Sequence, residues 1–125
     1  MKGILPSLFR SFGYAWRGLA VAFRTEHSFR LQVAIGLLVF AALWLFPLGV
    51  VERVVFLLAI GAVLVLELVN SMVERLTDLF KPRLHAYVRD IKDLMAAAVL
   101  VASATAAVVG VLVLWPHVLR ALQRL

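Results

Sequence analysis

Three long apolar stretches constrain this chain more than any other feature of its sequence. They lie at about residues 31–48, 54–79 and 94–115, and each has about the length that a helix needs to cross a bilayer, roughly 20 residues. The sequence is 64% hydrophobic and 16% charged, so a soluble domain of 125 residues could not cover its apolar surface. We therefore expect a single all-α membrane domain over residues 1–125, with three transmembrane helices.

The first 30 residues differ from these spans, because arginines recur among their apolar residues at roughly helical spacing. This pattern predicts an amphipathic helix on the membrane surface. Residues 1–30 hold five Lys and Arg residues and 75–92 hold five more, whereas the connection between the first two spans holds only Arg53. Since cytoplasmic loops collect positive charge, we expect a cytoplasmic N-terminus. Arg120 and Arg124 then lie on the opposite side, against the rule.

Net charge and cysteine content exclude several classes of function. The net charge is +6, but the basic residues cluster beside apolar spans, where they indicate contacts with lipid head groups rather than with nucleic acid. The chain has no cysteine, which excludes disulfides, thiolate metal sites and cysteine catalysis. No glycine-rich phosphate-binding loop is present.

Four polar residues interrupt the second span. At 100° per residue, Glu67, Asn70, Glu74 and Asp78 share one arc of about 80° on the helix surface. An acidic group at bilayer depth is costly and indicates a cavity, a cation or a functional role. The alternative is a helix end that emerges into water, which stays open for Asp78 and is disfavoured for Glu67 by its apolar neighbours.

The spacing suggests two roles within this row. Glu67 and Glu74 are separated by a rise of about 10 Å, which is too far for both to hold one ion comfortably. Glu74 suits a cation site shared with another acidic residue, and Glu67 lies where a lipid hydroxyl could reach it and lose a proton. Glu26, before the first span, is the candidate second ligand, although this segment taken alone favours an ordinary i, i+4 helix pair of Glu26 with Arg30.

The start of the third span adds a basic and an acidic residue. Lys92 could neutralise phosphate, and Asp93 could orient Lys92 or act as its counter-ion. The alternative, an interfacial lysine that extends toward lipid head groups, has equal support from the sequence.

Together these segments resemble the small bacterial integral-membrane lipid kinases, the family of diacylglycerol kinase and undecaprenol kinase. The resemblance rests on four segments: GYAWRGL (Gly13–Leu19), FRTEHSFR (Phe23–Arg30), ELVNSMVERLTD (Glu67–Asp78) and KDLMAAAVL (Lys92–Leu100). The third segment matches the family's ExxNxxxExxxD signature at every defined position.

The resemblance implies a role for each matching residue. Glu67 would be the catalytic base, and Glu26 and Glu74 would hold Mg²⁺ that bridges the phosphates of ATP. Asn70 and Arg30 would organise the site. The nucleotide-binding residues would be Arg10, Tyr14, Arg17, Glu26, Glu74, Asp78, Lys92 and Asp93. The family also implies a homotrimeric helical bundle in the bacterial inner membrane, with three spans and a surface helix per chain.

The expected function is ATP- and Mg²⁺-dependent phosphorylation of a lipid hydroxyl, most simply that of diacylglycerol to give phosphatidic acid. Undecaprenol is the alternative substrate. Gln32 departs from the family, which has Glu or His at this position, and this leaves details of nucleotide contact and lipid choice open. A non-enzymatic transporter or channel subunit is the rival from another class, although the first and third spans lack the second polar stripe that it would need.

Overall fold

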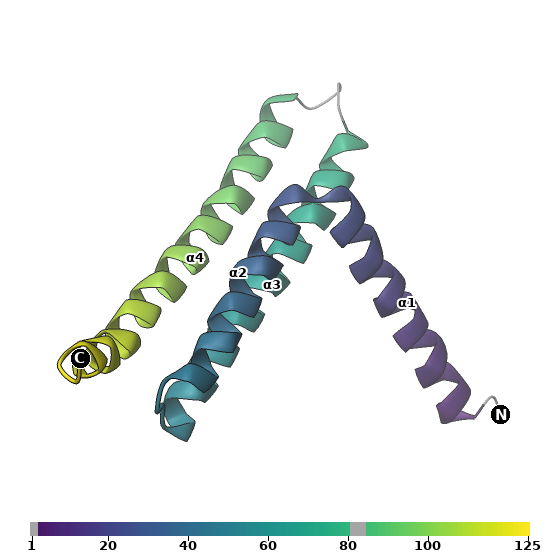
Figure 1. Ribbon diagram of the computed structural model, residues 1–125. Helices are drawn as coiled ribbons and strands as arrows, with labels where there is room; N and C mark the ends of the chain where they lie inside the picture. Colours follow the sequence, from purple (N-terminus) through teal and green to yellow (C-terminus); the bar gives the residue numbers. More distant parts are fainter. Residues whose placement is uncertain (1–2, 81–84) are drawn as a thin grey trace.

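The computed structural model describes residues 3–80 and 85–125, which fold into four helices. They are α1 (Ile4–Thr25), α2 (His27–Leu45), α3 (Val50–Asp78) and α4 (His85–Leu122). α2, α3 and α4 run alongside one another in alternating directions, while α1 leads away from them like the second arm of a V (Figure 1). The described part of the chain contains no strand, so the all-α prediction is confirmed.

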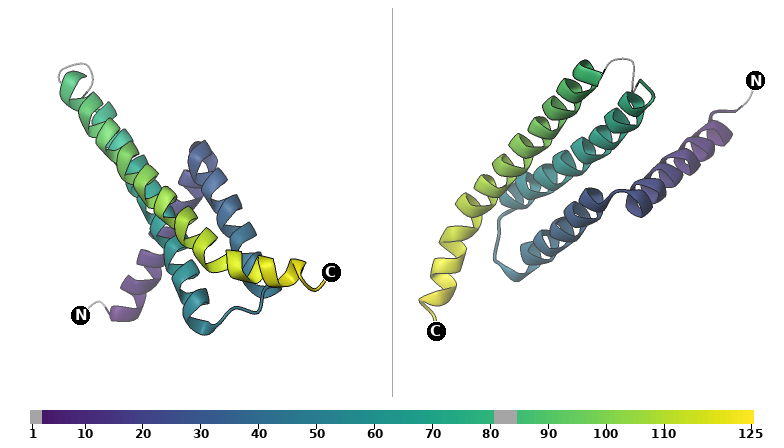
Figure 2. Two further views of the ribbon diagram at one scale, coloured as in Figure 1. Left: turned by 90° about the vertical axis from the view of Figure 1, so that its left-hand side faces the viewer. Right: turned by 90° about the horizontal axis from the view of Figure 1, so that it is seen from above.

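Helices α2, α3 and α4 are each long and apolar enough to cross a membrane, which agrees with the three expected spans. α3 packs against both α2 and α4, whereas α1 packs mainly against α2 (Figure 2). Large apolar side chains such as Trp44, Leu58 and Leu112 stay exposed on these helices. A soluble protein rarely leaves so much apolar surface uncovered, and a bilayer supplies the missing contacts.

The boundary between α2 and α3 follows from local chemistry. α2 ends at Leu45, and Phe46 has extended backbone angles (φ −102°, ψ 147°) because the ring of Pro47 disfavours a helical conformation in the residue before it. α3 starts at Val50, a turn before the span expected from residue 54. The helix therefore includes Arg53, which was expected in the connection, and its neighbour Glu52.

The fourth helix differs most from the expectation. The span predicted from about residue 94 belongs to a helix that already begins at His85. At its other end the helix continues beyond the span expected to about residue 115, through Pro116 to Leu122. Proline removes one backbone donor from a helix, and the bend near the yellow end of α4 lies in this region (Figure 2).

Close packing of α2 on α3 depends on a glycine. A Cβ atom at Gly36 would lie only 3.1 Å from Cγ2 of Ile60, so the glycine permits the approach of the two helices. Further along, Leu43, Leu48 and Phe56 form a buried cluster near the α2–α3 connection.

Polar contacts fasten the end of the bundle that contains the α2–α3 connection. Glu52 accepts a hydrogen bond from the Gly49 backbone N–H at 2.8 Å, and its other carboxylate oxygen lies 3.2 Å from Nε2 of His117 on α4. The guanidinium carbon of Arg53 lies 5.1 Å from the centre of the Trp44 ring. Glu52 thus both caps α3 and ties it to the segment of α4 beyond Pro116.

We expect Glu52→Ala to lower the thermal unfolding midpoint of the detergent-solubilised protein by several degrees. The substitution removes an acceptor from the first turn of α3 and leaves His117, which is buried, without its partner. Glu52→Gln is the matched control, because an amide oxygen can still accept the Gly49 hydrogen bond. Equal midpoints for Glu52→Ala and the unmodified protein would show that the contact does not stabilise the bundle.

Candidate functional site

The chain breaks its helix at Glu26, and this break brings α1, α2 and α3 together. Glu26 has extended backbone angles (φ −104°, ψ 111°) between α1 and α2. The Arg30 guanidinium donates to the backbone carbonyls of Phe23 and Arg24, both at 3.1 Å. These carbonyls end α1 and have no partner within the helix. Arg30 therefore caps α1, and the structure shows this contact in place of the i, i+4 pair with Glu26 that was the alternative role for these two residues.

The carboxylate of Glu26 is tied to the end of α3. Its Oε1 atom accepts hydrogen bonds from Nη2 of Arg75 at 3.2 Å and from the hydroxyl of Thr25 at 3.1 Å. Arg75 also donates to that hydroxyl at 2.8 Å. Glu26 thus lies at the level of Arg75 and its neighbour Glu74, as expected from the sequence.

Glu67 is buried within a single chain, with only 3% of its surface exposed. The hydroxyl of Ser28, in the first turn of α2, donates to Oε2 of Glu67 at 3.2 Å. The N-terminal turn of a helix favours negative charge. Ser71 donates to the backbone carbonyl of Glu67 at 3.0 Å and leaves its carboxylate untouched. The alternative interpretation, in which this part of the helix emerges into water, is therefore wrong for Glu67.

The other end of the polar row contacts α4. Nζ of Lys92 lies 2.7 Å from Oδ1 of Asp78, and the Asp78 side chain is 56% exposed. Asn70 and Glu74 are half-buried between this ion pair and Glu67, while Asp93 is exposed on α4. Because Glu67 faces α2 and Asp78 faces α4, the polar row lies between those two helices.

The three candidate residues on α1 are placed differently. Arg10, Tyr14 and Arg17 are exposed, and the guanidinium carbon of Arg17 lies 5.0 Å from the centre of the Tyr14 ring. They belong to the part of α1 that leads away from the bundle (Figure 1). The single chain does not bring them to Glu26 or Glu67, and their nucleotide role stays a prediction.

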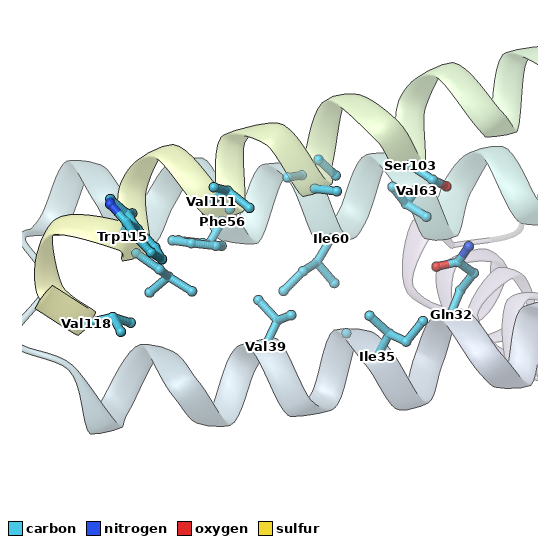
Figure 3. Close-up of a pocket in the computed structure, with 16 residues that line it drawn as sticks. Gln32, Ile35, Val39, Phe56, Ile60, Val63, Ser103, Val111, Trp115 and Val118 are labelled. Carbon is cyan, nitrogen blue, oxygen red and sulfur yellow. The ribbon is translucent and has the colours of Figure 1, made fainter. Parts of the chain in front are cut away.

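A groove of about 540 Å³ runs between α2, α3 and α4. Phe56, Ile60 and Val63 of α3 contribute to its lining. The groove is apolar along most of its length, and the two polar side chains, Gln32 and Ser103, lie together at one end (Figure 3). The lining residues are Gln32, Ile35, Gly36, Val39, Phe56, Ala59, Ile60, Val63, Ser103, Ala106, Ala107, Gly110, Val111, Leu114, Trp115 and Val118.

The groove and the polar row share one face of α3. At 100° per residue, the lining residues Phe56, Ile60 and Val63 fall within the same arc of about 80° as the polar residues from Glu67 to Asp78. The face changes from apolar to acidic between Val63 and Glu67, which are one helical turn apart. A molecule that lay along this face would meet hydrocarbon on one side of Glu67 and polar groups on the other.

Comparison with known proteins shows which family the chain belongs to. The family model for prokaryotic diacylglycerol kinase matches residues 13–114, most of the chain. The chain belongs to the prokaryotic diacylglycerol kinase family.

Relatives with both family activities are similar to this chain. A diacylglycerol kinase of Synechocystis is 36% identical over 117 residues, which are 93% of this chain and 67% of that protein. The Escherichia coli K12 diacylglycerol kinase is 32% identical over 111 residues, 88% of this chain and 90% of that protein. The undecaprenol kinase of Bacillus subtilis is 32% identical over 112 residues, 90% and 91% of the two chains.

Membership makes the chain a lipid kinase of the diacylglycerol kinase family, with a lipid and ATP as its substrates. The expected family and enzyme class are thereby confirmed. The rival interpretation as a transporter or channel subunit is wrong.

The carboxylates of Glu26 and Glu74 suit Mg²⁺ bound together with a nucleotide better than they suit a metal bound by protein side chains alone. Across residues 3–80 and 85–125, no group of three or more His, Cys, Asp or Glu side chains could hold an ion. Mg²⁺ usually takes one or two carboxylates together with waters and substrate phosphates. Glu26 and Glu74 are oxygen donors of this kind, so they suit a cation that arrives with a triphosphate.

Proposed function

We propose that this protein transfers the terminal phosphoryl group of ATP to the hydroxyl of diacylglycerol and forms phosphatidic acid. The change from apolar groove to acidic row along one face of α3 carries the proposal. With its chain in the groove, a lipid would present its hydroxyl near Glu67, where the polar row begins. A triphosphate from the aqueous side would meet Glu74, Asp78 and Lys92.

Glu67 would act as the general base. Its carboxylate would take the proton from the lipid hydroxyl while the hydroxyl oxygen attacks the terminal phosphorus of ATP. The Ser28 hydrogen bond fixes one carboxylate oxygen and thereby the orientation of the group. The surrounding helices exclude water, and this would favour transfer to lipid over hydrolysis of ATP.

The remaining polar residues would hold the nucleotide. Glu26 and Glu74 would hold Mg²⁺, which would offset the negative charge of the phosphates. Lys92, paired with Asp78 at the edge of the row, would turn its ammonium group toward the phosphates. Asn70 would donate from its amide between the two sets of carboxylates, and Asp93 would support Lys92.

We also propose that α1 lies on the cytoplasmic surface of the bacterial inner membrane and that the protein forms a homotrimer. The exposed apolar side chains of α1, interspersed with Arg10 and Arg17, suit a helix at the lipid–water boundary. In a trimer, Arg10, Tyr14 and Arg17 of one subunit would complete the nucleotide site of another, which would account for their distance from it within one chain.

Labelled ATP tests the proposal directly. The purified protein in lipid nanodiscs is incubated with Mg²⁺, ATP carrying a labelled terminal phosphate, and one of three lipids: diacylglycerol, undecaprenol or a lipid without a free hydroxyl. We expect label in phosphatidic acid and none in the third lipid. Label in undecaprenyl phosphate alone would show that undecaprenol, not diacylglycerol, is the substrate. Label in no lipid would overturn the proposed function.

Replacing Ser28 with alanine should lower kcat for lipid phosphorylation by about tenfold, because a hydrogen bond to a charged group contributes about 1.5 kcal/mol or more. The KM for ATP should change little, since the hydrogen bond found for the Ser28 side chain among the described residues goes to the carboxylate of Glu67. Initial rates at varied ATP concentration measure both constants.

Two variants control this prediction. Ser28→Thr retains a hydroxyl and should retain most of the activity. Ser71→Ala removes a hydroxyl that donates to the Glu67 backbone carbonyl and leaves the carboxylate untouched, so it should leave kcat nearly unchanged. A Ser28→Ala enzyme with an unchanged kcat would show that Ser28 does not orient the base.

A further inference from the structure

Two polar groups lie where the groove approaches Glu67. Gln32 of α2 and Ser103 of α4 extend from opposite walls at the same end of the groove, with Val63 beside them (Figure 3). The hydroxyl oxygen of Ser103 is buried and has no hydrogen-bond partner among the described residues. Buried hydroxyls nearly always have a partner, so this one indicates a ligand group that the chain itself does not supply.

Their depth relative to Glu67 is set by helix geometry. Gln32 follows Ser28, the partner of Glu67, by one turn of α2. Val63 precedes Glu67 by one turn of α3. One turn corresponds to a rise of about 5 to 6 Å. Gln32 and Ser103 therefore lie about that much deeper in the bundle than the Ser28–Glu67 contact.

We propose that Gln32 and Ser103 donate hydrogen bonds to an ester carbonyl of the lipid substrate and so select a glyceride over a polyprenol. The inference rests on the proposed function, because it takes the reacting hydroxyl to lie at Glu67. In diacylglycerol an ester carbonyl follows that hydroxyl after a few covalent bonds, and this separation suits one helical turn. In a polyprenol only hydrocarbon follows the hydroxyl.

The polar groups of the groove should favour binding of an ester lipid over binding of a polyprenol. An ester oxygen satisfies the Ser103 hydroxyl and the Gln32 amide at the depth where they lie. A hydrocarbon there removes water from the Gln32 amide and leaves both the amide and the Ser103 hydroxyl unpaired. A buried polar group without a partner is costly, so the hydrocarbon is disfavoured. We expect a preference for the ester of about 10²-fold in kcat/KM, because two hydrogen bonds of about 1.4 kcal/mol each correspond to this ratio.

A single acyl chain is the occupant that the groove fits best. From Ser103 to Val118 the α4 wall extends about 22 Å, somewhat more than the half-thickness of about 15 Å of a bilayer's hydrocarbon core. An apolar helix from a second copy of this chain would cover Gln32 and Ser103 with hydrocarbon and leave them unpaired. The two polar groups therefore favour an ester lipid over a neighbouring helix.

An ether analogue isolates the role of the carbonyl. Dioleoylglycerol and its dialkyl ether analogue share the hydroxyl and similar chains, but the ether lacks carbonyl oxygens. We expect the unmodified enzyme in nanodiscs to favour the diester by about 10²-fold in kcat/KM, and the Gln32→Leu/Ser103→Ala variant to bring this ratio close to one. In the same variant, kcat/KM for undecaprenol should rise relative to kcat/KM for the diester.

Ser103→Thr is the matched control, because it keeps the hydroxyl and should keep most of the preference. An active double variant whose diester-to-ether ratio equals that of the unmodified enzyme would overturn the inference, as would an equal loss with both lipids. Ser103→Ala alone, a smaller change, should lower the ratio partway and provides the test if the double variant does not fold. An unmodified enzyme that phosphorylates no diacylglycerol would instead contradict the proposed function.

Discussion

Glu67→Gln is expected to reduce lipid phosphorylation by about 10²- to 10⁴-fold, the contribution of a positioned general base. Glutamine has nearly the shape of glutamate and can accept the Ser28 hydrogen bond, but it cannot take up the proton of the lipid hydroxyl. Glu67 is buried at the inner end of the polar row, away from the Asp78–Lys92 pair. The measurement is the initial rate of label transfer to diacylglycerol at saturating ATP and Mg²⁺.

Glu52→Gln is a suitable control for this prediction, because it makes the same chemical change on the same helix at the opposite end of the bundle. It should retain nearly full activity. A Glu67→Gln enzyme with more than about a tenth of the unmodified rate would contradict the role of Glu67 as the base, since so small a loss lies below the usual contribution of such a group.

Glu74→Gln should have a different effect. We expect the concentration of Mg²⁺ that gives half-maximal activity to rise steeply and kcat/KM for ATP to fall by about 10²-fold or more, because a bound metal contributes several kcal/mol to phosphoryl transfer. Glu74 is half-buried on α3, next in sequence to the arginine that holds Glu26. Raising the Mg²⁺ concentration should restore part of the activity.

The dependence on metal concentration distinguishes this role from general damage to the fold. Asp90→Asn removes an exposed carboxylate from the first turns of α4, at the end of the bundle where Glu74 lies. It should leave the Mg²⁺ requirement unchanged. If Glu74→Gln lowered the maximal rate without changing the Mg²⁺ requirement, Glu74 would not be a metal ligand.

The sequence predicted the fold well where hydrophobicity alone decides it. Spans of apolar residues have few options in a bilayer, since every backbone polar group must be satisfied within a helix. The ends of the helices were harder to place. Pro116 is a strong stop signal in sequence, yet α4 continues past it, and His117 in the following segment contacts Glu52, a residue far away in the chain.

The candidate site could be predicted in part. Periodicity placed Glu67, Asn70, Glu74 and Asp78 on one face, and the structure extends that face into the groove. The partners of these groups were not predictable in the same way. Ser28 has no unusual sequence signal, and its contact joins residues 39 positions apart.

Two further contacts show the limit of local reasoning. Arg75 pairs with Glu26 across 49 positions, whereas the local rule for helix pairs pointed to Arg30. In the sequence, Gln32 differs from the family pattern, but nothing at this position indicates a groove. Its place on the groove wall depends on how three helices pack together. The one signal that could have indicated the groove is the continuation of the 67–78 face back to Phe56.

The central claim is a division of roles along α3, with the lipid hydroxyl at Glu67 and the metal–nucleotide complex at Glu74. Calorimetric titration of nanodisc-embedded protein with Mg²⁺ and a non-hydrolysable ATP analogue tests it most directly. We predict that Glu67→Gln binds the complex about as tightly as the unmodified protein, while Glu74→Gln binds it far more weakly. Equal weakening in both variants would contradict the division and place Glu67 in the nucleotide site.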